Sequence, residues 1–275
     1  MIIIKKILIP LVFINIFFGS PTYLTLPTQE GGRIKPLDSF AKNQLLLFYG
    51  KDAIKQSDNK DNIPAIEWLI NLLTNPSKEL EKEIFYISNW ANSPEVEVSL
   101  GLDSRESHLY SFYEIIEGFQ NNQSLLEGLK NKSEESYTYV EKQIVDIYTK
   151  VVFLDEIAHS FMCFVPLIEI SNKEVSKALN VKLGQKLSYS FFVSNIELFS
   201  PLMQELLDVS PENWTDKHQE LNKIALELHS VGQYQYAKAL KIFPQYSMDE
   251  LWLSPWELME IKDIDSNQRT MLQEL

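Results

Sequence analysis

Histidines, the cysteine and closely spaced carboxylates are the residues of this sequence that could do chemistry. His159 follows Asp155 by four residues and Glu156 by three, so Asp155 and His159 would face each other on a helix. Such a pair suits two ligands of a metal site or a tuned acid–base pair, although its commoner role is a surface ion pair. Because a metal site needs a third ligand, we expect no metal here.

Haem is the one cofactor for which single residues are candidates. His159 or Met162 could serve as an axial ligand, but the chain lacks a Cys-x-x-Cys-His attachment sequence. Cys163 stands in an apolar setting with no adjoining cation, so we expect an inert core thiol. The expectation is therefore no cofactor, with haem at His159 as the open alternative.

An enzyme is not predicted. The sequence has no phosphate-binding loop, nucleophile elbow or metalloprotease motif, and its carboxylates are too scattered to single out an acid–base pair. With a single cysteine the chain has no internal disulfide. A formal net charge of −13 repels phosphate backbones, so we expect no nucleic-acid partner.

The most distinctive stretch of the sequence is residues 31–41, Gly-Gly-Arg-Ile-Lys-Pro-Leu-Asp-Ser-Phe-Ala. Its candidate structural or interaction residues are Gly31, Gly32, Arg33, Lys35, Pro36 and Asp38. The glycines free the backbone, and Asp38 or Ser39 can cap a helix that starts near Phe40. Two roles stay open: a strap in which Arg33 pairs with a carboxylate, or a docking surface for a membrane partner.

The chain divides into three parts by composition. Residues 1–22 have a positive start followed by an apolar run, which predicts a signal peptide cleaved after Thr22, or an uncleaved N-terminal membrane anchor. Either outcome predicts an exported, periplasmic body. Residues 23–261 form a helical domain, and residues 262–275 form a polar tail.

Hydrophobic periodicity predicts a mainly α fold, a bundle-like body of several helices with at most a minor β element. The strongest seam is Tyr137, Val140, Ile144, Ile147, Val151, Leu154, Ala158 and Phe161, which predicts one long helix over about 133–163. Gly50 should stop the first helix, and Ser111 with Glu114 has the spacing of a capping box. Residues 83–88 favour a short strand.

The segment 26–41 resembles a stretch in system II cytochrome c biogenesis proteins of the CcsA/ResB type, in the fused forms that carry an extra-cytoplasmic region. The shared pattern is Gly-Arg-(apolar)-x-Pro-(apolar)-Asp-(Ser/Thr)-(apolar)-Ala. Further similar segments follow in the same order, at residues 65–73, 84–87, 100–102, 110–112, 242–244 and 252–255. The resemblance covers most of the chain after the leader.

This resemblance implies an accessory periplasmic module of cytochrome c maturation that assists haem attachment by binding or scaffolding rather than by catalysis. Its implied partners are a CcsA/ResB-type membrane synthetase and apocytochrome c. The family handles haem in a polytopic domain with a tryptophan-rich motif and flanking histidines, which this sequence lacks, so those roles do not carry over. Two alternatives are an exported helical haem-binding carrier and an exported scaffold unrelated to cytochromes.

Overall fold

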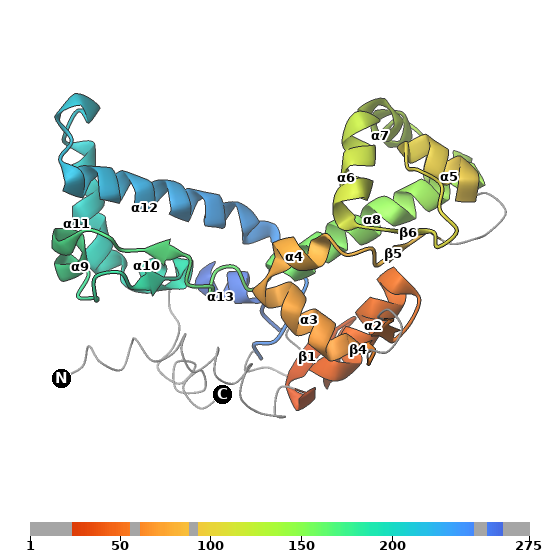
Figure 1. Ribbon diagram of the computed structural model, residues 1–275, viewed down its shortest axis with the longest axis horizontal. Helices are drawn as coiled ribbons and strands as arrows, with labels where there is room; N and C mark the ends of the chain where they lie inside the picture. Colours follow the sequence, from red (N-terminus) through yellow and green to blue (C-terminus); the bar gives the residue numbers. More distant parts are fainter. Residues whose placement is uncertain (1–23, 56–60, 88–92, 245–251, 261–275) are drawn as a thin grey trace. The chain divides into compact units, whose positions relative to one another are not determined.

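The computed structural model describes residues 24–55, 61–87, 93–244 and 252–260 (Figure 1). The leader 1–22 and the tail 262–275 expected from the sequence lie outside these residues. The described chain is mainly helical, with short two-stranded antiparallel sheets, which confirms the predicted fold class. No helix in the described ranges has the length and apolar character needed to cross a bilayer.

The described chain forms two compact units, an N-terminal unit of residues 24–158 and a C-terminal unit whose described residues start at His159. The sequence predicts a helical domain over 23–261 and gives no sign of this division at His159. The boundary coincides with the C-terminal end of helix α8, where the chain turns toward β7. The apolar seam runs up to the boundary, so periodicity alone does not reveal it.

The N-terminal unit packs its helices around aromatic side chains. Its elements are β1 (Pro27–Glu30), β2 (Arg33–Pro36), α2 (Leu37–Tyr49), β3 (Ala53–Ile54), β4 (Ile63–Pro64), α3 (Ala65–Thr74), α4 (Pro76–Leu80), β5 (Phe85–Tyr86), α5 (Ser93–Leu100), β6 (Leu109–Tyr110), α6 (Phe112–Asn121), α7 (Gln123–Lys130), η3 (Glu134–Ser136) and α8 (Tyr139–His159). The ring of Phe48 lies 6.3 Å from Trp68, 5.8 Å from Phe85 and 6.3 Å from Phe153, measured between centroids. Phe48 therefore joins α2, α3, β5 and α8 in one core.

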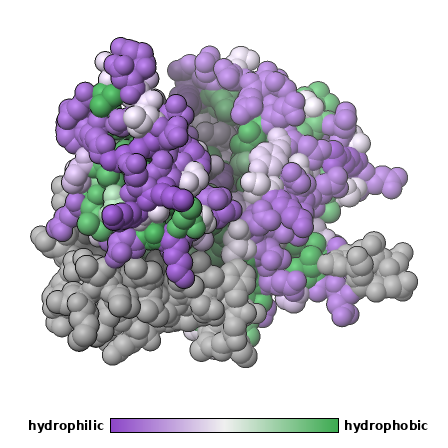
Figure 2. Space-filling view, turned by 60° about the vertical axis from the view of Figure 1, so that its left-hand side comes forward, coloured by the Kyte–Doolittle hydropathy of each residue, from purple (hydrophilic) through white to green (hydrophobic). Residues whose placement is uncertain are grey.

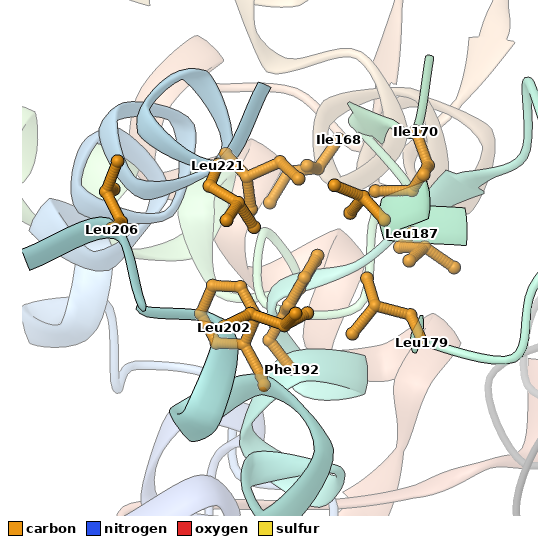
Figure 3. Close-up of a cluster of buried hydrophobic side chains, with 11 residues drawn as sticks. Ile168, Ile170, Leu179, Leu187, Phe192, Leu202, Leu206 and Leu221 are labelled. Atoms are coloured by element: carbon orange, nitrogen blue, oxygen red, sulfur yellow. The ribbon is translucent and has the colours of Figure 1, made fainter. Parts of the chain in front are cut away.

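The C-terminal unit is built on an aliphatic core. Its elements are β7 (Ile168–Glu169), α9 (Lys173–Ala178), β8 (Lys186–Leu187), α10 (Tyr189–Ser194), α11 (Ile196–Leu207), η4 (Pro211–Asn213), α12 (Asp216–Gly232), η5 (Gln233–Tyr236) and α13 (Pro255–Glu260). Leu202 and Leu206 of α11 and Leu221 of α12 meet Ile168 and Leu187 of the β7–β8 pair (Figure 3). This cluster holds the helices to the short sheet.

The long helix α8 is shorter at both ends than the expected 133–163. Residues 134–136 form the separate 3-10 turn η3, and Thr138 caps α8 by accepting from the Glu141 amide at 3.2 Å. The chain turns after His159. From Ile144 onward the predicted seam is buried, at Ile144, Ile147, Val151, Leu154 and Ala158, whereas Val140 in the first turn is half-buried.

Local signals also held elsewhere in the N-terminal unit. Gly50 ends α2 in the left-handed conformation with φ of +75°, and its N–H donates to the Leu46 carbonyl at 3.1 Å. Ser111 and Glu114 form the predicted capping box of α6. Within the expected strand 83–88, Phe85 and Tyr86 pair with β6.

Candidate functional site

The candidate segment 31–36 forms a β-hairpin. Strands β1 and β2 pair antiparallel, with Glu30 opposite Arg33, so Gly31 and Gly32 are the two residues of the loop. Their φ angles are +56° and +74°, and positive φ at both loop positions is what a type I′ turn requires. An added Cβ at either glycine would meet no atom within 4 Å. The glycines are therefore needed for backbone conformation and not for close approach.

Glu30 fixes the hairpin to the first helix. Its carboxylate accepts hydrogen bonds from the Gln44 side-chain amide and, at 3.3 Å, from that of Asn43 on α2. The ammonium of Lys35, on the neighbouring strand, forms an ion pair with the same carboxylate. The Leu37 amide donates to the Leu26 carbonyl at 2.8 Å, which closes the base of the hairpin.

Arg33 and Asp38 do not play the strap roles expected of them. Arg33 is exposed and has no ion-pair partner among the described residues, because Lys35 occupies the carboxylate at the hairpin. Helix α2 starts at Leu37 after Pro36, without a side-chain cap, so Asp38 lies inside its first turn. There Asp38 accepts from Lys42 at 2.7 Å and raises the pKa of that lysine.

The tip of the hairpin is uncovered. Every residue of the loop is exposed, as are Arg33 and Pro36, and Ile34 keeps 62% of its surface exposed. Thr28 and Gln29 of β1 are buried, so the hairpin presents β2 outward. Arg33 and Ile34 are consecutive residues of a strand, so their side chains point to opposite faces of the hairpin, and both are exposed to a partner at its tip.

His159 ends α8 in a packed setting. Its imidazole is 9% exposed and stacks on the Tyr234 ring, with centroids 4.1 Å apart and planes 6° from parallel. Its carbonyl accepts from the Trp256 indole at 3.1 Å. Asp155 lies one helical turn earlier on α8, half-buried. Stacking and burial leave His159 a small exposed edge, which favours a structural role over ligation of a large cofactor.

Met162 and Cys163 pack into the small apolar cluster that includes Val231, Ala237 and Trp256. Cys163 is fully buried, and burial raises the pKa of its thiol far above the ordinary value. This agrees with an inert core cysteine. Within the described ranges, no three His, Cys, Asp or Glu side chains are grouped so as to hold a metal ion.

The structure brings together a polar cluster that the sequence analysis missed. Glu97 of α5 is 1% exposed, and its Oε1 lies 2.7 Å from Nδ1 of His108. Burial raises the pKa of Glu97, but the hydrogen bond from His108 and the nearby Ser104 and Tyr110 hydroxyls lower it below its ordinary value. Because an ionised carboxylate only accepts, Nδ1 of His108 carries the proton.

Arg105 adds a positive charge next to this cluster. Its guanidinium pairs with Glu83 at 3.0 Å and with Glu114, and it lies 4.7 Å from the centroid of the Tyr110 ring. His108 adopts φ of +50°, and its carbonyl accepts from the Ile87 amide at 2.9 Å. These contacts hold α5 and the 101–108 loop against the β5–β6 pair, so the cluster has a structural role.

No residue spacing in the sequence would have revealed this cluster. Glu97 and His108 are separated by eleven residues, and the turn that joins them depends on left-handed backbone at both Gly101 and His108. The one available signal was the predicted capping box, which places Glu114 next to Arg105.

The hairpin is the candidate site that combines exposure, defined geometry and unused side-chain chemistry. The Glu97 cluster is buried, and His159 is stacked. Comparison with protein-family models, with curated proteins and with solved structures found no match for the chain.

Proposed function

We propose that this chain is an exported binding module that assists cytochrome c maturation of the system II type by docking and scaffolding, without catalysing a reaction. The observation that carries the proposal is the hairpin β1–β2, which is hydrogen-bonded to α2 and displays Arg33 and Ile34 to solvent. It coincides with the segment that resembles the CcsA/ResB-type proteins. An exposed element that is already folded suits docking onto a partner, because less conformational entropy is lost on binding than for an unstructured segment.

The surface charge supports a second contact within the same function. With a formal net charge of −13, the chain would attract a lysine-rich apocytochrome c and steer it by long-range electrostatics. The face in Figure 2 is mostly hydrophilic, with hydrophobic residues in small separate areas. A polar, acidic surface of this kind suits transient binding of a basic chain.

Co-purification tests the docking. The tagged full chain, produced with a CcsA/ResB-type synthetase, should retain that membrane protein, and Arg33→Glu should reduce its recovery. Lys142→Glu is the matched control, since Lys142 is another exposed cation of the N-terminal unit. Circular dichroism should be unchanged in both variants. Failure of the unsubstituted chain to retain the synthetase, or equal loss in both variants, would contradict the proposal.

Salt dependence tests the second contact. Binding of the chain to an apocytochrome c should weaken as ionic strength rises, because screening shortens the reach of charge–charge attraction. Absence of binding at low salt, or binding that does not change with salt, would rule out electrostatic capture.

A further inference from the structure

The tip of the β1–β2 hairpin carries a cation and an aliphatic side chain that the described protein does not use. Lys35 is paired with Glu30, whereas Arg33 has no ion-pair partner among the described residues. Ile34 follows it in β2, on the opposite face of the hairpin, with 62% of its surface exposed. The loop at Gly31 and Gly32 is surrounded by open space. A partner that binds this tip should therefore offer negative charge to Arg33 and an apolar or interfacial environment to Ile34.

The sequence before the hairpin indicates what that environment is. No charged residue occurs from position 7 to position 29, so Glu30 and Arg33 are the first charges after Lys6. A helix of about 20 residues spans the hydrocarbon core of a bilayer. If the apolar leader is held in a membrane, the hairpin follows it within a few residues, at the depth of the lipid headgroups.

We propose that the hairpin tip lies in the headgroup layer of the membrane that holds the leader, with Arg33 on lipid phosphates and Ile34 in the interface. A guanidinium binds phosphate through two parallel hydrogen bonds. An aliphatic side chain gains by leaving water for the interfacial region. The inference rests on the exported, membrane-side placement in the proposed function, and it describes the chain without the synthetase, which would replace the lipid at the same two side chains.

Net charge explains why this contact needs the leader. A chain of net charge −13 is repelled as a whole by an anionic bilayer. Tethering by the leader converts the weak contact of one arginine and one isoleucine into an intramolecular event with a high effective concentration. The contact should therefore be local to the hairpin and absent from other exposed apolar residues.

A depth-sensitive fluorophore on a cysteine at position 34 tests the proposal. The full chain with Ile34→Cys is reconstituted into phosphatidylcholine vesicles, with or without phosphatidylglycerol. Val98→Cys on α5 is the control, because Val98 is also apolar and is 78% exposed. The native Cys163 is fully buried with a raised thiol pKa, so it should not react, as labelling of the unsubstituted chain would verify.

The probe at position 34 should shift to the blue and be quenched by brominated lipids, whereas the probe at position 98 should do neither. Adding Arg33→Gln should reduce the shift in the anionic vesicles. Absence of a shift at position 34, equal shifts at both positions, or a purified chain whose mass shows loss of the leader would overturn the inference. A shift seen only when the synthetase is also present would overturn it as well, while supporting the proposed function.

Discussion

Glu97 in the N-terminal unit and Glu220 in the C-terminal unit are both buried, and their carboxylates find hydrogen-bond donors in different ways. In the C-terminal unit, Glu220 is 7% exposed and accepts both the N–H and the O–H of Ser171, each at 2.6 Å. In the N-terminal unit, Glu97 accepts from His108, and its Oε2 has no hydrogen-bond partner among the described residues. Both carboxylate oxygens of Glu220 thus accept hydrogen bonds from neutral donors. Only one oxygen of Glu97 accepts a hydrogen bond, and its donor, His108, is ionisable.

The difference shows that burial alone does not measure what a charged residue contributes. A buried carboxylate is favourable only to the extent that donors replace its lost hydration. Glu220 joins α12 to Ser171, the second residue after β7, across 49 positions of sequence. Glu97 is more deeply buried and less completely compensated. We therefore expect Glu220 to stabilise its unit more than Glu97 stabilises its own.

Removal of Glu220 should give the largest effect. Glu220→Ala deletes two charge-assisted hydrogen bonds and should lower the free energy of unfolding by about 3 kcal/mol. Glu220→Gln keeps one acceptor and can donate to the Ser171 hydroxyl, so about 1 kcal/mol is expected. Urea unfolding measures both variants, and hydrogen exchange over residues 168–187 localises the loss. Equal destabilisation by the two variants would argue against the hydrogen-bond explanation.

The next largest difference in stability between the units is expected from replacing a helical glycine by alanine. A Cβ on Gly118 of α6 would lie 2.5 Å from the Leu100 carbonyl oxygen, whereas one on Gly232 would make an ordinary 3.5 Å contact with Tyr189. Gly118→Ala should therefore destabilise the N-terminal unit by about 2 kcal/mol through overpacking.

Gly232→Ala is the matched control and should stabilise α12 by about 0.5 kcal/mol, because alanine favours the helix. Thermal unfolding of both variants makes the comparison. A stable Gly118→Ala protein would mean that α5 and α6 are not in close contact.

Loss of Glu97 should matter less than loss of Glu220. Glu97→Ala removes one good hydrogen bond but also a buried carboxylate oxygen without a partner, so about 1 kcal/mol is expected. Urea unfolding beside Glu220→Ala gives the comparison directly. If Glu97→Ala proved the more damaging, the assignment of Glu97 as the incompletely compensated carboxylate would be wrong.

Acid should weaken the N-terminal unit through Glu97 and Glu114. Burial raises the pKa of both Glu97 and Glu114, but hydrogen bonds lower it by more. His108 donates to Glu97, and Ser111 and Arg105 donate to Glu114, so both pKa values lie below the ordinary 4.5. A lowered pKa in the folded state gives stability that is present above about pH 4.5 and is lost as pH falls through the folded value.

In the C-terminal unit the same sign holds for Glu257 of α13: burial raises the pKa of its carboxyl, and hydrogen bonds from Lys241 and Ser254 lower it below the ordinary value. Hydrogen exchange at decreasing pH should therefore show α5 and α6 losing protection as the pH falls below about 4.5. Replacing both Glu97 and Glu114 by glutamine should remove most of that pH dependence in α5 and α6, and an unchanged dependence would contradict the linkage argument.

The smallest effect is a difference in tautomer that leaves stability unchanged. Nδ1 of His108 donates to Glu97, whereas Nδ1 of His218 accepts from the Thr215 amide at 3.1 Å. Nitrogen chemical shifts at neutral pH should thus report a proton on Nδ1 of His108 and on Nε2 of His218. The same tautomer at both would mean that one of these contacts is misassigned.

Local sequence determined several features of the local structure, although not the cap of α2 or the ends of α8. The α8 seam, the Gly50 stop and the Ser111–Glu114 capping box depend on neighbours within one or two helical turns, and the structure has each of them. The buried setting of Cys163 followed from its apolar neighbours. Side-chain spacing and backbone propensity act over such short ranges, so they can be interpreted without a fold.

Only the tertiary structure decided what these elements are used for. Gly31 and Gly32 suit a hinge, a close approach or a turn equally well, and pairing of β1 with β2 selects the type I′ turn. Glu97 reaches His108, and Glu220 reaches Ser171, across loops whose path no local preference specifies. Whether a buried carboxylate stabilises or destabilises the protein depends on the hydrogen-bond donors that the fold brings to it. Those donors come from distant parts of the chain.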